Sequence, residues 1–323
     1  MFPTDCQLDK GGETVRICVT GGAGFIGHHV VRELRAGGHE VLVVDNLSTG
    51  RRENVPADVV FVQADILEKA GAAAIAAYRP EALLHLAAQV TIRGSMEGIA
   101  EDARQNFLGT AQVLETAMRA GSRRFVMASS MAIYADSPQP APINEQWPTR
   151  PRSPYGISKL ASEELVHLMG ERSGITTMAL RFFNTFGSGQ ILTPYVGVIT
   201  IFVDRILAGN PPVIFGDGEQ CRDFVHVGDV ARSCRLALES KVTGCSINIG
   251  TGRGTTVNQV AALLLKRLGS SLSPTHIEGR PEENHNSVAD ITLAHDLLGY
   301  RPQGTLEGNL DEVLPDALRN LKP

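Results

Sequence analysis

The feature that most constrains the fold of this chain is a strand, a glycine-rich turn, a helix and a second strand near the N-terminus. The apolar pattern predicts a buried strand over 15–20, and the run GGAGFIG follows at 21–27. A helix is expected over about 25–36, and a second strand over 40–44 ends at Asp45. This order is that of a dinucleotide-binding βαβ unit.

The three-residue spacing of Gly21, Gly24 and Gly27 fits the backbone approach that such a unit needs. Glycine lets the main chain come close to a pyrophosphate at a helix N-terminus. Asp45 is placed to accept hydrogen bonds from both ribose hydroxyls and would repel a 2′-phosphate, so NAD is favoured over NADP. A glycine-rich turn without function is the alternative, and the flanking strands and Asp45 argue against it.

Further strands are predicted over 59–63, 82–86, 125–127 and 177–181, alternating with helices. This alternation predicts an α/β fold, a Rossmann-type doubly wound parallel sheet with helices on both faces. One long amphipathic helix is expected over 96–120.

The pattern changes after residue 181, where glycine, proline and aromatic residues separate short elements. We therefore predict an NAD-binding Rossmann domain over 14–181 and a smaller C-terminal α/β substrate lobe over 182–323. Segments near 225–250 are expected to return to the first domain. Ligands of such sheets bind in the crevice at the carboxyl ends of the strands.

Composition excludes several classes of protein. The formal net charge of −5 gives no electrostatic footprint for nucleic acid or an anionic membrane, and no apolar run approaches membrane-spanning length. The five cysteines are scattered without a C-x-x-C, so neither a disulfide framework nor a metal site is expected. Residues 1–13 lack an apolar run and do not form a signal peptide, which fits a reducing cytoplasmic setting.

Tyr155 and Lys159 lie four residues apart in the run YGISK, which places both on one face of a helix. Ser153 and Pro154 suit the start of that helix, as N-cap and first helical residue. A phenol has a pKa of about 10, and a nearby lysine cation favours the phenolate. The pair is therefore a candidate proton-transfer device, with a solvated helix face as the alternative.

These residues belong to a longer set of motifs that resembles one known family. The chain is similar to the extended short-chain dehydrogenase/reductases, and within them to the nucleotide-sugar 4-epimerases related to UDP-glucose 4-epimerase. The matching runs are GGAGFIG (21–27), DNLSTG (45–50), HLAAQ (85–89), SSMAIY (129–134), YGISK (155–159), LRFFN (180–184), RDFVHVGDVA (222–231), NIGTG (248–252) and RPEE with VAD (280–290).

The resemblance implies a role for each matching residue. Tyr155 would be the acid/base at the sugar 4-hydroxyl, Lys159 would bind the nicotinamide ribose, and Ser130 would hydrogen-bond the same hydroxyl. Asn184, Arg222 and Arg280 would hold the substrate diphosphate, although Glu282 replaces the usual glycine after Arg280-Pro281. The expected cofactor contacts are Gly21, Gly24, Phe25, Ile26, Gly27, Asp45, Asn46, Asp65, Ile66, Leu86, Ala87, Ala88, Asn106, Tyr155 and Lys159.

The activity implied is NAD-dependent 4-epimerisation of a nucleotide sugar through a transient 4-keto sugar. The 4,6-dehydratases of the family carry Asp-Glu after the serine, and other relatives use a cysteine there. Met131 and Ala132 occupy those positions and transfer no protons. A non-catalytic NAD-sensing protein is the alternative of another class, and the presence of Ser130, Tyr155 and Lys159 argues against it.

The sequence constrains the identity of the sugar less than it constrains the type of reaction. Family resemblance places Ser287 at the wall facing the C2 substituent, where a small residue is typical of members that accept N-acetyl sugars. The loop 189–192 has no cation for a carboxylate, so a UDP-hexose or UDP-N-acetylhexosamine is favoured over UDP-glucuronate. UDP-glucuronate stays an alternative because Arg93 could reach the site. A homodimer is expected through the helices over 96–120 and 154–172.

Overall fold

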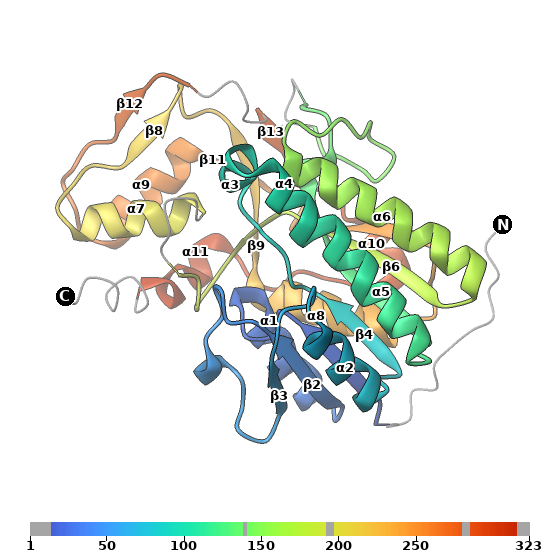
Figure 1. The fold of residues 1–323 in the computed structure, drawn as a ribbon. Helices are drawn as coiled ribbons and strands as arrows, with labels where there is room; N and C mark the ends of the chain where they lie inside the picture. The colour runs from blue at the N-terminus through green and yellow to red at the C-terminus, as the bar shows by residue number, and fades with distance from the viewer. Residues whose placement is uncertain (1–13, 138–140, 192–196, 280–284, 315–323) are drawn as a thin grey trace.

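A seven-stranded parallel sheet forms the centre of the protein (Figure 1). The computed structural model describes residues 14–137, 141–191, 197–279 and 285–314. The strand order is β10-β6-β5-β4-β1-β2-β3, with every neighbouring pair parallel. Its strands are β1 (Arg16–Thr20), β2 (Glu40–Asp45), β3 (Val60–Gln63), β4 (Ala82–His85), β5 (Arg124–Ser130), β6 (Thr176–Phe182) and β10 (Cys245–Ile249).

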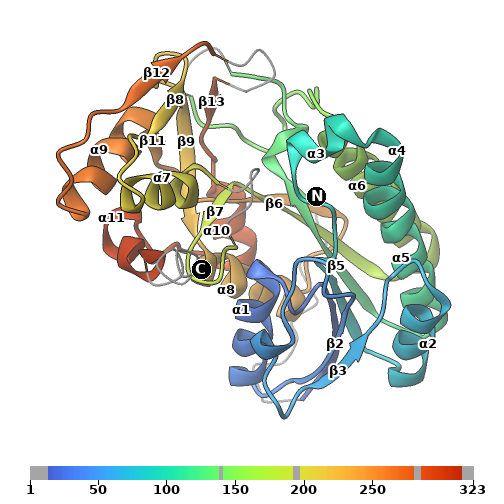
Figure 2. The ribbon, with the colours of Figure 1, turned by 60° about the vertical axis from the view of Figure 1, so that its left-hand side comes forward.

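Helices cover both faces of this sheet, as Figure 2 shows. Strands buried on both faces read as continuous apolar runs, which is the pattern of VLVV in β2. One face carries α1 (Phe25–Ala36), α8 (Val227–Glu239) and α10 (Thr292–Leu298). The other face carries α2 (Lys69–Tyr78), α5 (Gly109–Arg119) and α6 (Pro154–Ser173). The prediction of a Rossmann-type doubly wound α/β fold is therefore confirmed.

The prediction of a long helix over 96–120 is confirmed over 99–119, but the helix begins only after Gly98 and contains a π-helical turn. The segment contains α3 (Ile92–Glu97), α4 (Ile99–Asp102), a π-helix (Ala103–Leu108, η2) and α5. Gly98, with φ −137° and ψ 66°, leaves helical geometry between α3 and α4. The π-helix contains Asn106, whose side chain bonds the backbone of Gln89. Such π-helical turns are frequent at functional sites.

The remaining elements form a smaller lobe above the carboxyl edge of the sheet, with an apolar core of its own. In it β9 pairs with β7, β11 and β13, and β8 pairs with β12. Its elements are β7 (Asn184–Phe186), α7 (Val198–Leu207), β8 (Val213–Phe215), β9 (Cys221–His226), β11 (Gly254–Thr256), α9 (Val257–Arg267), β12 (Thr275–Ile277), β13 (Asn286–Ser287) and α11 (Leu306–Asn309).

Three elements that follow residue 182 in the chain lie with the large sheet: β10, α8 and α10, the last on the same face as α1. Strand β10 extends it beside β6, and α8 packs beside α1. The domain boundary at 181 stays a prediction. Within the ranges given above, no helix is both long and apolar enough to cross a membrane, and no cluster of three His, Cys, Asp or Glu is placed to bind a metal ion.

Candidate active site

The glycine-rich turn between β1 and α1 lies against the end of β4. Gly21 has a φ of +73°, and a Cβ there would lie 2.6 Å from the Ala87 nitrogen. A Cβ on Gly27 would lie 2.1 Å from the Gly21 carbonyl oxygen. Side chains at these two positions would therefore push α1 away from the strand ends.

The first turn of α1 offers backbone donors to an anion. Gly24 is the N-cap and has no side chain to bond the first N–H groups, which come from Phe25 and Ile26. Helix N-termini of this kind bind phosphate. Asp45, at the end of β2, accepts the Ala23 N–H at 2.9 Å and so lies beside the turn. The arrangement fits a dinucleotide, with its pyrophosphate at α1 and a ribose at Asp45.

Three further residues expected to contact the cofactor, Asn46, Asp65 and Ile66, follow the ends of β2 and β3. The Asn46 side-chain amide donates to the Asp65 carboxylate at 3.0 Å. Asp65 also accepts the Leu67 N–H at 2.8 Å in the turn before α2. Ile66 packs against Gly109, since a Cβ on that glycine would lie 2.8 Å from it. Contacts of Asn46, Asp65 and Ile66 with the cofactor stay a prediction.

The segment after β4 is fixed by Asn106. Its side-chain oxygen accepts the Gln89 N–H at 2.9 Å, and its amide donates to the Gln89 carbonyl at 3.0 Å. Leu86 continues the strand by donating its N–H to the Thr20 carbonyl at 3.0 Å. Ala87 and Ala88, between these anchors, are half-buried and small, so they leave space over the strand ends.

Ser130, Tyr155 and Lys159 converge where β5 ends and α6 begins. Ser153 caps α6 by accepting the Gly156 N–H at 3.1 Å, with Pro154 following, so the predicted helix start is confirmed. A Cβ on Gly156 would lie 2.4 Å from the Ala132 carbonyl oxygen, so the glycine after the tyrosine lets α6 pack against the turn after β5.

Burial dominates the electrostatics of this group. It raises the pKa of Tyr155 to about 12, while the hydrogen bond with Ser130 lowers that pKa and the charge of Asp102 raises it. Burial also lowers the pKa of Lys159 to about 8, against the charges of Asp102 and Glu163. The Lys159 ammonium lies 5.9 Å from the Tyr155 ring centroid and donates to the Ala128 carbonyl at 3.0 Å. Ser130 thus favours the phenolate of Tyr155, while an effect of Lys159 on the pKa of Tyr155 stays a prediction.

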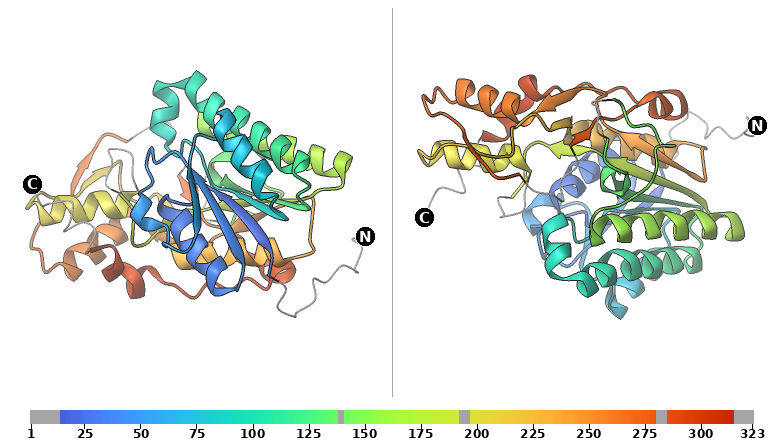
Figure 3. Two further views of the ribbon diagram at one scale, coloured as in Figure 1. Left: turned by 60° about the horizontal axis from the view of Figure 1, so that its bottom comes forward. Right: turned by 90° about the horizontal axis from the view of Figure 1, so that it is seen from above.

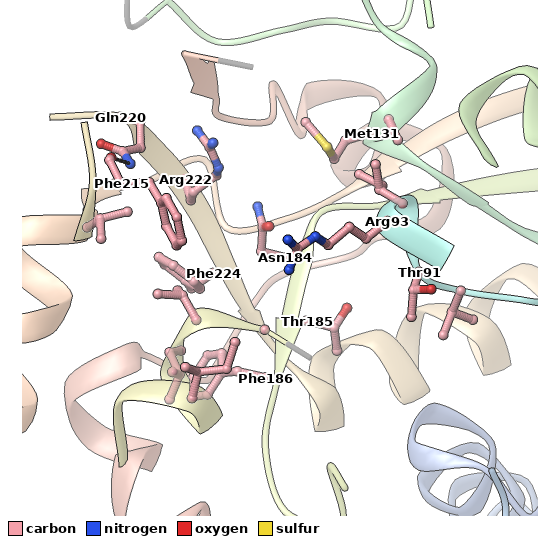
Figure 4. Close-up of a pocket in the computed structure, with 18 of the residues that line it drawn as sticks. Thr91, Arg93, Met131, Asn184, Thr185, Phe186, Phe215, Gln220, Arg222 and Phe224 are labelled. Carbon is pink, nitrogen blue, oxygen red and sulfur yellow. Dashed lines mark hydrogen bonds between the residues drawn. The ribbon is translucent and has the colours of Figure 1, made fainter. Parts of the chain in front are cut away.

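A cavity of about 480 Å³ opens between this group and the smaller lobe. Figure 4 shows the Arg93 side chain extended toward Asn184, with Arg222 beyond it beside Phe215 and Phe224. Among the described residues that line the cavity, three are arginines and none is acidic, which suits an anionic ligand. The lining includes Val90, Thr91, Arg93, Met131, Ala132, Arg152, Ser153, Asn184, Phe215, Gln220, Arg222 and Phe224.

The structure places the residues predicted to contact the substrate in different positions relative to the cavity. Asn184 and Arg222 line the cavity from the neighbouring strands β7 and β9. Arg280 lies outside the described residues. Ser287 pairs with Arg222 in register but is fully buried, and its hydroxyl has no hydrogen-bond partner among the described residues. The structure does not bring Ser287 to the cavity, so its contact with the sugar stays a prediction.

Sequence reasoning missed two parts of this region. Phe215 and Phe224 line the cavity from the lobe, and only the rule that ligands bind at the strand ends could have suggested them. Asp102 is buried and accepts the Ser158 hydroxyl at 2.7 Å, joining α4 to α6 directly beside Lys159. Nothing in the sequence indicated this contact, because periodicity alone does not distinguish Asp102 from the other charged residues of a long surface helix.

The parallel sheet, the turn at its carboxyl edge and the Ser130, Tyr155 and Lys159 group define an extended short-chain dehydrogenase/reductase. The model of the NAD dependent epimerase/dehydratase family matches residues 17–250. The chain belongs to this family.

Individual relatives match over nearly the whole chain. A UDP-glucose 4-epimerase of Mycolicibacterium smegmatis is 34% identical over 297 residues, covering 90% of this chain and 95% of the relative. The structure of UDP-glucose 4-epimerase from Thermotoga maritima with UDP-glucose has 38% identity and a TM-score of 0.90, covering 95% of this chain and 100% of that one. The Thermus thermophilus UDP-glucose 4-epimerase complex with NAD has 35% identity and a TM-score of 0.88, with the same coverage.

Proposed function

We propose that this protein is an NAD-dependent 4-epimerase of a nucleotide sugar, most directly a UDP-hexose or UDP-N-acetylhexosamine. The observation that carries the proposal is the convergence of Ser130, Tyr155 and Lys159 beside a cavity lined by Asn184 and Arg222. The UDP-glucose 4-epimerases among the similar proteins support the same reaction. NAD, bound at the α1 turn, would accept the hydride from C4 of the sugar and would then return it to the same carbon.

The protein's own residues would position the sugar and move its proton. Tyr155 removes the proton of the 4-hydroxyl as the C4 hydrogen departs, and Ser130 holds the oxygen that becomes the ketone. Arg222 and Asn184 would retain the diphosphate while the 4-keto sugar rotates in the site. The hydrogen then returns to the opposite face of C4. Lys159 holds the cofactor ribose.

The type of reaction is tested by its product. Incubation with NAD and a UDP-hexose should give the C4 epimer, because Met131 and Ala132 have no group that moves a proton at C5 or C6. Accumulation of a 4-keto-6-deoxy sugar, seen by its absorbance in alkali, would instead indicate a dehydratase.

One observation favours a second candidate, a UDP-glucuronate 4-epimerase. Arg93, which the sequence left as a distant cation, lines the cavity on the side of Met131 and Ala132. A carboxylate on C6 of the sugar would find a cation there, so the missing charge in the loop 189–192 does not exclude an acidic sugar. We keep the neutral sugar as the first proposal, and Arg93 provides the test between them.

Arg93→Gln should reduce kcat/KM for UDP-glucuronate at least about tenfold more than for UDP-glucose, since a hydrogen bond to a charged group contributes about 1.5–3 kcal/mol. Steady-state assays of both sugars check this. The control is Arg104→Gln, because Arg104 is exposed on the neighbouring π-helix and should change neither value. Equal losses for both sugars would mean that Arg93 does not meet the carboxylate. A higher kcat/KM of the wild type for UDP-glucuronate than for every neutral sugar would make the second candidate the function.

We also propose that the protein is a homodimer, working in the reducing cytoplasm. The right-hand view of Figure 3 shows α5 and α6 side by side on the flank away from the lobe. Ile157 and Leu168 on α6, and Leu108 before α5, are about half exposed there at 56%, 46% and 54%. Pairing of two copies would cover this apolar surface. Light scattering at micromolar concentration should give twice the mass of the 34.6 kDa chain, and a monomer mass would contradict it.

A further inference from the structure

A buried carboxylate outside the predicted site lies next to its catalytic helix. Asp102 is 1% exposed at the end of α4, immediately before the π-helix. One of its oxygens accepts the Ser158 hydroxyl at 2.7 Å, and the other accepts the Asn106 side-chain amide at 3.0 Å. Burying a charge costs free energy unless the charge is paired and hydrogen-bonded. The charged form of Asp102 therefore depends on these two bonds.

These two bonds connect the separate halves of the site. Ser158 directly precedes Lys159 on α6. Asn106, the other partner, also bonds both backbone groups of Gln89, which follows the small residues at the end of β4. Asp102 therefore joins the helix that carries the proton-transfer residues to the segment expected beneath the cofactor.

We propose that Asp102 is a positioning residue of the epimerase: a buried counter-charge that keeps Lys159 protonated and ties α6 to the Asn106 segment. The proposal rests on the proposed function for its effect on turnover. Lys159 donates to the neutral Ala128 carbonyl, and the other acid that acts on its charge, Glu163, is paired with Arg181 at 2.7 Å. Of these two acids, Asp102 is thus the one that forms no salt bridge with any described arginine or lysine.

The charged and titratable groups around Lys159 act in known directions. Asp102 and Glu163 raise the pKa of Lys159, against the larger lowering by burial. The Asp102 charge also raises the pKa of Tyr155, after burial, while Ser130 lowers it. His85, on β4, is held neutral because burial and the charge of Lys159 lower its pKa to about 3. Removal of the Asp102 charge should therefore lower the pKa values of Lys159 and Tyr155 together.

Asp102→Asn keeps the shape of the side chain and removes its charge. In the cofactor-free protein, NMR of ¹³Cε-labelled lysine should show the Lys159 titration moved down by about one pH unit, the scale of a nearby charge. The chain has six lysines, so the Lys159 signal is identified by its loss in Lys159→Arg. An unchanged Lys159 titration would overturn the proposal, whether or not the protein is an epimerase.

The pH profile of turnover gives the second readout. The acid limb, where Tyr155 must lose its proton, and the alkaline limb, where Lys159 must keep its own, should both move to lower pH in Asp102→Asn. A purely structural role would lower the rate at every pH without moving either limb, and that result would refute the proposal.

The matched control is Asp229→Asn, a carboxylate 1% exposed at the start of α8 and paired with Arg232 instead. It should change stability without shifting Lys159 or the pH limbs. If Asp102→Asn does not fold, Asp102→Ser, which leaves room for water, carries the same two measurements. A wild type without epimerase turnover would refute the proposed function, while the lysine titration would still decide the role of Asp102.

Discussion

Tyr155→Phe is expected to lower kcat at least about 10²-fold while leaving NAD binding intact. The substitution removes one oxygen atom, and a positioned acid/base contributes about 10²–10⁴-fold. Tyr155 is 9% exposed in the first turn of α6, and phenylalanine has the same ring, so it fits the same space. Steady-state kinetics and fluorescence titration of NAD measure the two quantities separately.

Tyr78→Phe is the control for this substitution. Tyr78 ends α2 on the face of the sheet, and burial also raises its pKa to about 12, but it lies outside the cavity lining. It should keep kcat within about twofold. A Tyr155→Phe protein with an unchanged rate would remove Tyr155 from the mechanism and would favour a dinucleotide-binding protein without this chemistry.

Glu163→Ala should destabilise the protein by about 3–5 kcal/mol, because it leaves the buried Arg181 guanidinium without its counter-charge. Glu163 is 1% exposed and accepts two Arg181 nitrogens at 2.7 and 3.1 Å, and it also accepts the Ser246 hydroxyl at 3.0 Å. The pair joins α6 to β6 and β10 behind the catalytic residues. Urea denaturation at a fixed subunit concentration measures the change in the free energy of unfolding.

Glu115→Ala provides the matched comparison. Glu115 pairs with Arg119 one turn along α5 at 2.6 Å, but both side chains are more than half exposed. Such exposed helical pairs contribute about 0.3–0.5 kcal/mol. A loss for Glu163→Ala as small as that for Glu115→Ala would mean that the buried pair does not hold α6 against the sheet.

The local features of the site could be predicted from sequence because each depends on neighbouring residues. The N-cap at Ser153 and the order of elements around the glycine turn follow from periodicity and capping rules. The parallel sheet follows from the same alternation, since strands joined by helices are parallel. These rules require no knowledge of distant contacts.

The rest depends on contacts between distant segments, which periodicity does not contain. The apolar pattern of 96–120 continues through a break at Gly98 and through a π-helix in which Asn106 bonds Gln89. Spacing on one helix predicted an effect of Lys159 on Tyr155, but it could not show that burial, Ser130 and Asp102 also shift the pKa of Tyr155. Arg93 and Arg222 come from elements 129 positions apart, and only the folded lobe brings both into one cavity.

The most direct test of the central claim follows the hydrogen at C4 of the sugar. The wild-type protein with NAD should convert UDP-[4-²H]glucose into UDP-galactose that keeps its deuterium at C4, because the hydrogen that leaves this carbon returns to its other face within the closed site. Proton and deuterium NMR of the product measure both the configuration and the label. A C4 epimer that has exchanged its deuterium for solvent hydrogen would contradict the account, and so would the absence of C4 epimerisation with UDP-glucose, UDP-N-acetylglucosamine and UDP-glucuronate alike.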